Sequence, residues 1–164
     1  CFKHHNYNKD EYRFGDRRAV IVDYAVLSQD GMNCSHVNHG EHIDLLISVR
    51  VDSPIQKPII GYSIKRVDGV TLAGTNTRQM DRVLEPFTEM GVVLTFRFQL
   101  HMCLAPSDIF IELGVADFID DGDFPADIRK NIIHVKVIGN DRFEGLVGMT
   151  KSLEDFRENS STHE

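Results

Sequence analysis

Apolar residues recur at every second position in several short stretches of the chain, and Gly, Asp or Asn residues separate these stretches. In the clearest stretch, residues 43–51, five apolar side chains alternate mainly with polar ones. This period-two pattern is typical of a β-strand with one buried face. The same reasoning predicts eight strands in all, over residues 19–27, 43–51, 59–67, 70–77, 92–102, 109–116, 132–138 and 143–149.

Eight short strands separated by turns predict an all-β fold. We expect an immunoglobulin-like antiparallel β-sandwich, with a β-barrel as the alternative. The dipeptide Asp68-Gly69 between the third and fourth strands indicates a two-residue hairpin turn. Residues 1–17 are polar and irregular, so we expect a linker remnant there, one sandwich domain over 18–150 and a mobile tail over 151–164.

The composition is that of an ordinary globular protein, since 41% of the 164 residues are hydrophobic and 26% are charged. Lys and Arg total 18 against 25 Asp and Glu, and the net charge of −7 argues against nucleic acid and anionic membranes as partners. No apolar run approaches the ~18 residues of a membrane-spanning helix. The three Cys residues show no paired spacing, which favours a reducing compartment, here the cytoplasm.

The sequence contains no GxxxxGK[ST], GxGxxG, HExxH or GxSxG motif, so we expect neither an enzyme nor a bound cofactor. Two clusters contain the residue types of metal sites, although both also fit ordinary polar loops. The acidic segment from Asp117 to Asp123 keeps open an alternative function, a β-sandwich module for protein interaction or calcium binding. The zinc-like cluster comprises Cys34, His36, His39, Glu41 and His42, and the calcium-like cluster comprises Asp117, Asp120, Asp121 and Asp123.

A more specific site follows if the third, sixth and seventh predicted strands share one sheet. Alternation then turns a set of small and polar residues outward, and the small residues leave a shallow trough with donors, acceptors and an aromatic ring at its rim. That combination suits a sugar, which offers hydroxyl groups and apolar C–H faces. The predicted carbohydrate-binding residues are Ser63, Lys65, Phe110, Glu112, His134 and Lys136.

An ordinary solvated sheet surface would explain the same outward residues. If they do form a site, Lys65, Lys136 and protonated His134 would suit an acidic sugar or a phosphate or carboxylate terminus. On the opposite sheet Arg97, Gln99 and His101 form a second-choice binding or dimer face, where cross-strand ion pairs are the simpler explanation.

Several segments together, from about residue 18 to 149, resemble the C-terminal carbohydrate-binding domain of Wzt. Wzt is the ATP-binding subunit of ABC exporters of O-antigen polysaccharide. Each motif alone is short, and it is their order along the chain that carries the resemblance. The segments are Gly40-Glu41, Pro58-Ile59-Ile60-Gly61-Tyr62-Ser63-Ile64, Asp68-Gly69-Val70, Gly74-Thr75-Asn76-Thr77 and Phe143-Glu144-Gly145-Leu146-Val147.

The resemblance implies a non-catalytic domain that recognises the finished, terminally modified non-reducing end of a lipid-linked O-antigen polysaccharide. It implies a cytoplasmic position on the exporter, with the nucleotide-binding domain and the membrane-spanning subunit as partners. It also implies a homodimer in which the last strand is exchanged. That strand would comprise Phe143, Glu144, Gly145, Leu146, Val147, Gly148 and Met149. The chain has no Trp, so sugar stacking would fall to Phe or Tyr.

Overall fold

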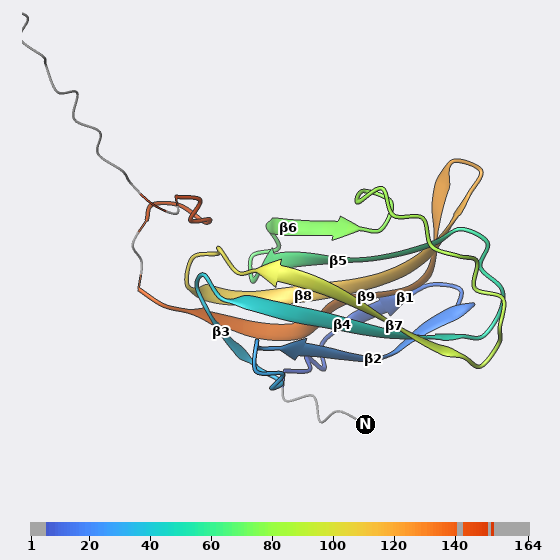
Figure 1. The fold of residues 1–164 in the computed structure, drawn as a ribbon, viewed down its shortest axis with the longest axis horizontal. Helices are drawn as coiled ribbons and strands as arrows, with labels where there is room; N and C mark the ends of the chain where they lie inside the picture. Colours follow the sequence, from blue (N-terminus) through green and yellow to red (C-terminus); the bar gives the residue numbers. More distant parts are fainter. Residues whose placement is uncertain (1–5, 141–142, 151, 153–164) are drawn as a thin grey trace, which may run out of the picture.

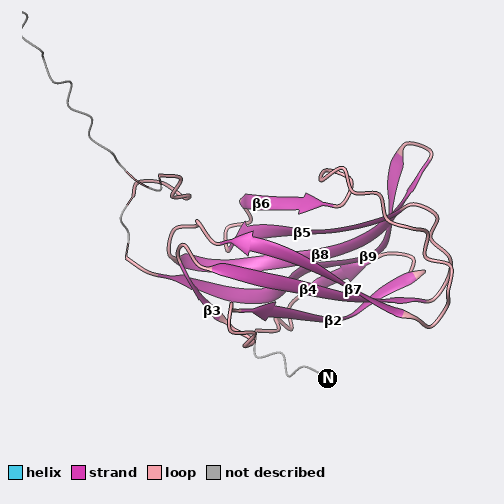
Figure 2. Cartoon of the chain, in the orientation of Figure 1, coloured by secondary structure: helices cyan, strands magenta, loops and turns pink. Residues whose placement is uncertain are grey.

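The computed structural model describes residues 6–140, 143–150 and 152, and within them the chain forms nine β-strands and no helix (Figures 1 and 2). These residues therefore include no helix long and apolar enough to cross a membrane. The predicted all-β class is confirmed. The strands are β1 (Tyr12–Phe14), β2 (Ala19–Leu27), β3 (His36–Asn38), β4 (His42–Val51), β5 (Pro58–Arg66), β6 (Thr71–Asn76), β7 (Val93–His101), β8 (Ser107–Ile119) and β9 (Gly122–Ile138).

The strands form two sheets that pack face to face, so the fold is a sandwich and not a barrel (Figure 1). The larger sheet has the order β1-β9-β8-β5-β6, with the short β3 also pairing with β9, and the smaller sheet has the order β2-β4-β7. Neighbouring strands are antiparallel except for β3 and β9. As predicted from the sequence, the strands at 59–67, 109–116 and 132–138 share one sheet.

Alternation decides which side chains of that shared sheet reach the core. The tyrosine of β5, Tyr62, turns inward and meets Phe98 of β7 edge-on, with ring centroids 5.2 Å apart. The outward positions between the core residues are half-buried or exposed on β5 and β9. The predicted strand parity is therefore confirmed. The buried inward residues are Ile60, Ile64, Ile109, Ile111, Leu113, Val115, Ile133, Val135 and Val137.

Two tight turns connect neighbouring strands of the larger sheet. Four residues, 67–70, separate β5 from β6, and not the predicted two. Gly69 has φ +86° there, and the Arg66 N–H donates to the Val70 carbonyl at 2.9 Å. Between β8 and β9 a two-residue turn joins Ile119 to Gly122, and both turn residues have positive φ. Because the chain reverses within these two residues, β8 continues to Ile119 and β9 begins at Gly122. Both strands are therefore longer than the predicted 109–116 and 132–138.

Residues 143–149, expected as a strand, are irregular in the structure. Val147 forms an isolated bridge with Leu104, and two backbone hydrogen bonds of 2.8–2.9 Å join this segment to residues 103–105. The Phe143 ring packs beside His39 at 4.8 Å. Exchange of this segment between two chains remains a prediction. The expected tail beyond residue 150 lies, apart from residue 152, outside the described residues, as do residues 1–5 of the expected linker.

Residues 6–18, called the N-terminal arm here, fell mostly in the expected linker, yet in the structure they lie along β9. Tyr7 bridges to Ile133, and β1 pairs with β9 from Tyr12↔Lys130 to Phe14↔Ile128. The sequence pattern missed β1 because a three-residue strand has too few positions to show a period.

A buried ion network holds the N-terminal arm in place. The Asp127 carboxylate has no exposed side-chain surface, and it accepts hydrogen bonds from Arg13 at 2.6 and 2.9 Å, from Arg17, and from the Ile21 backbone N–H at 2.8 Å. A second pair, Arg129 with Glu11, has a shortest N···O distance of 2.5 Å. Buried charges persist in proteins only when paired in this way.

The Glu11 carboxylate gives the arm a pH dependence. Partial burial opposes its ionisation, but hydrogen bonding and charge from Arg129, with a hydrogen bond from Tyr7, outweigh burial and lower the pKa of Glu11. A lowered folded-state pKa means that the stabilisation is complete above the unfolded-state pKa and is lost as pH falls through the folded-state value.

We therefore expect Glu11→Gln to be less stable than wild type at pH 7, with the difference shrinking as pH falls below about 4, near the ordinary Glu pKa. Thermal melting of both proteins between pH 7 and pH 3 measures this. Melting temperatures that stay equally far apart at every pH would contradict it.

Candidate functional site

One continuous row of paired residues crosses the outer face of the larger sheet. It runs Phe14↔Ile128, Ile128↔Gly114, Gly114↔Gly61 and Gly61↔Asn76, and so spans all five strands from β1 to β6. Directly paired residues lie on the same face of a sheet. The middle of the row is therefore glycine, with larger side chains on both sides of it.

The two glycines of this row form the floor of a hollow of about 450 Å³, called the trough here. A Cβ on Gly61 would come within 2.7 Å of the Asn76 Cβ and 2.8 Å of the Thr75 carbonyl oxygen, so the close approach of β6 requires glycine. A Cβ on Gly114 would meet only the end of the Ile128 side chain, at 3.0 Å. Ile59, Ala116 and Pro125 add apolar surface to the trough.

The polar rim of the trough is built around Glu112. Its Oε2 accepts a hydrogen bond from the Ser63 hydroxyl at 2.9 Å and lies 3.1 Å from Lys65 Nζ. Ser63 and Glu112 face each other across β5 and β8, and both line the trough. The structure thus brings together three of the predicted binding residues, Ser63, Lys65 and Glu112. Lys65 neutralises the charge of the Glu112 carboxylate.

The other predicted residues lie further along the same outer face, outside the trough lining. Phe110 pairs with His134, and their rings are 5.3 Å apart. His134 Nε2 lies 2.9 Å from Asp108 Oδ1, and Lys136 is the cross-strand partner of Asp108. Lys65 and His134 therefore each contact a carboxylate, and Lys136 lies opposite one, which makes an acidic ligand less favourable here.

The sequence reasoning missed several residues of the trough because they come from turns and strand ends. Asn76 lines it from the end of β6, Gln79 from the turn that follows, and Asp123 from the start of β9. The Asn76 Oδ1 accepts the Gln79 N–H at 2.9 Å, so this side chain also caps its own turn. Period-two alternation has no signal for such positions.

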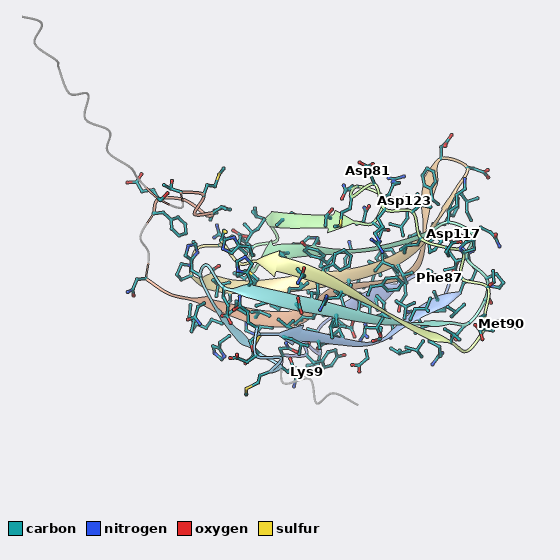
Figure 3. All side chains as sticks on the ribbon, viewed as in Figure 1. Lys9, Asp81, Phe87, Met90, Asp117 and Asp123 are labelled. Carbon is teal, nitrogen blue, oxygen red and sulfur yellow. The ribbon has the colours of Figure 1, made fainter. Side chains whose placement is uncertain are left out.

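A second hollow, of about 510 Å³, adjoins the trough at Ile59 and lies beneath the 77–86 loop. Its floor includes Phe118, and the Arg78 guanidinium lies over that ring at 4.6 Å. Arg78 also pairs with Asp123 at 3.3 Å, which places this ion pair at the boundary between the two hollows. Figure 3 labels Asp123, near the start of β9, and Asp81 of that loop.

The second-choice face lies on the outside of the smaller sheet, and its predicted binding residues contact side chains of the neighbouring strand. Arg97 lies 3.7 Å from Asp44, and the His101 ring stacks on His42 with centroids 4.3 Å apart. Gln99 lines a shallow hollow beside Asp44. These contacts are cross-strand pairs of the kind that stabilise a sheet surface.

The residues of the two metal-like clusters have other roles in the structure. Asp117 is buried and bound by Arg18 and the Lys57 N–H, while Asp120 and Asp121 form the turn between β8 and β9. In the other cluster His39 bonds to the Leu104 carbonyl. Within residues 6–140, 143–150 and 152, no three His, Cys, Asp or Glu side chains are placed to hold a metal ion.

The fold and much of the sequence match known proteins. A family model described as the Wzt C-terminal domain matches residues 10–149. A crystal structure of the C-terminal domain of Wzt is similar with a TM-score of 0.81 at 25% identity, covering 92% of this chain and 92% of that chain. A β-glucosidase from Listeria innocua in complex with glucose covers 71% of this chain and 16% of its own, at 14% identity and a TM-score of 0.40. No curated protein sequence matches the chain.

Proposed function

The chain belongs to the family of Wzt C-terminal domains, and we propose that it binds the non-reducing end of an O-antigen polysaccharide in the trough. In this proposal it has no catalytic role and confers substrate specificity on an ABC exporter at the cytoplasmic side of the membrane. Its partners are the lipid-linked glycan, a second copy of the chain, the nucleotide-binding domain and the membrane-spanning subunit.

The chemistry of the trough is the observation that supports this proposal. A hollow with a glycine floor beside Ile59, Ala116 and Pro125 accepts the apolar face of a sugar ring, and Ser63 and Glu112 at its rim offer hydrogen bonds to hydroxyl groups. Because Lys65 already neutralises Glu112, the site suits an uncharged sugar better than an anionic one.

The proposal is tested by calorimetric titration of the chain with the O-polysaccharide of the strain that encodes it and with a heterologous O-polysaccharide. Binding to the cognate polymer alone supports it. Binding of neither polymer by the folded protein would overturn it and favour a docking role within the exporter.

We expect Glu112→Ala to weaken binding of the cognate polysaccharide about tenfold, since it removes a charged hydrogen-bond acceptor and frees Ser63 and Lys65. Asp108→Ala is the matched control, because Asp108 lies on the same strand and the same face but outside the trough. Calorimetry of both variants measures the effect. Equal losses in both would show that the binding surface is not the trough.

A further inference from the structure

Two aromatic residues of β1 lie on the same outer face as the trough. Phe14 pairs with Ile128 and Tyr12 pairs with Lys130, while Ile128 in turn pairs with Gly114 of the trough floor. Since paired residues share a face, the Tyr12 and Phe14 side chains continue the row of the trough to the edge of the sheet.

The two rings form a small aromatic surface. Their centroids are 5.6 Å apart, and the planes are inclined by 32°. Tyr12 is 63% exposed, so most of its surface is not used to cover the core. Lys130 Nζ lies 5.6 Å from the centre of the Phe14 ring, which adds an N–H donor beside the aromatic surface.

The opposite face of β1 fixes the position of these rings. Arg13 stands between them in the sequence and points the other way, into the buried pairing with Asp127. A strand anchored on its inner face loses little conformational freedom when its outer face binds a ligand. The aromatic surface is therefore held ready by the same network that attaches the N-terminal arm.

We propose that Tyr12 and Phe14, with Lys130, form a second sugar subsite, so that the ligand is an oligosaccharide segment lying across the strands. The inference rests on the proposed function of the trough and extends it. One sugar ring occupies the trough, and a later ring of the same chain stacks on the aromatic surface while its hydroxyl groups accept from Lys130. Two interstrand spacings, about 10 Å, separate Gly114 from Phe14, which is more than one sugar ring.

The spacing makes ligand length the decisive variable. Single sugars and fragments of two to four sugars, released from the cognate O-polysaccharide by mild acid, are titrated into ¹⁵N-labelled protein and followed by NMR. We expect Tyr12→Ala and Phe14→Leu to weaken binding of the longer fragments about threefold to tenfold each. Affinity for the single sugar that fits the trough is expected to stay unchanged.

Three controls separate stacking from structural damage. Tyr12→Phe keeps the ring and is expected to bind as wild type. Phe124→Leu removes an exposed aromatic ring from a different strand, β9. Phe124 does not line the trough, although Pro125 beside it does, so this variant is expected to bind as wild type. Melting temperatures show whether β1 remains folded, and Tyr12→Ala keeps the test valid if Phe14→Leu does not fold.

Each outcome decides one question. Wild-type affinity of the Tyr12→Ala and Phe14→Leu variants for the longer fragments overturns the second subsite and leaves the trough intact. Weakened binding of single sugars and longer fragments alike also overturns it, because the effect is then not confined to a second ring. No binding of any fragment or of the whole polymer by wild-type protein overturns the proposed function itself.

Discussion

Replacing Asp127 by Ala is expected to lower the free energy of unfolding by about 3 kcal/mol. The side chain is wholly buried, and its loss leaves the Ile21 N–H without an acceptor and removes the counter-charge of Arg13 and Arg17. The value lies at the low end for a broken buried ion pair because both guanidinium groups are partly exposed and regain some hydration. Urea unfolding at pH 7 followed by circular dichroism measures it.

Asp52→Ala is the control for this variant. Asp52 also forms a bidentate pair, with Arg50 at 2.6 and 2.8 Å, but that pair is on the surface, where ion pairs contribute little. Its urea midpoint is expected to match that of wild type. A similar result for Asp127→Ala would mean that the N-terminal arm is not held by this network.

Gly114→Ala is expected to weaken binding of the cognate polysaccharide at least about tenfold with little change in melting temperature. The added methyl group raises the trough floor where a sugar ring would rest, so the ring no longer packs closely against the floor and its dispersion attraction falls. Because the methyl meets only the movable end of Ile128, the fold tolerates it. Calorimetric titration together with thermal melting separates the two effects.

Gly122→Ala is the matched control, since a Cβ at that position makes only ordinary contacts of 3.6 Å and lies at the far hairpin. It is expected to bind as wild type. If Gly114→Ala binds as well as the control does, the ligand does not lie on the glycine floor.

Alternation along the strands made the outer face of the larger sheet predictable from sequence. Once β5, β8 and β9 share a sheet, Ser63 and Glu112 must face the same way. The structure places the Ser63 Oγ 2.9 Å from the Glu112 Oε2. Strand order and parity do not, however, fix how far along the strands two residues meet. That is why Lys136, predicted with the others, lies opposite Asp108 and away from the trough.

Each of the remaining differences has its own physical cause. β1 is defined by pairing with a strand more than a hundred residues later, and Arg13 acquires its buried partner only through that pairing. The acidic residues at 120–121 read as possible ligands, but their small polar side chains instead tolerate the positive φ that the tight turn requires. The sequence predicts a strand over residues 143–149, but within the described part of this segment only Val147 forms a bridge, with Leu104.

The placement of Arg13 and Phe14 on opposite faces of one short strand links two equilibria. Undocking of the N-terminal arm would break the Arg13 pairing and remove the Phe14 ring from the sugar surface in the same event. A saturating glycan that occupies both subsites would therefore stabilise the docked arm by the threefold to tenfold affinity that the second subsite adds, about 0.7–1.4 kcal/mol. By reciprocity, anything that loosens the arm lowers glycan affinity by the same factor. The docked fraction of the arm would thus report glycan occupancy.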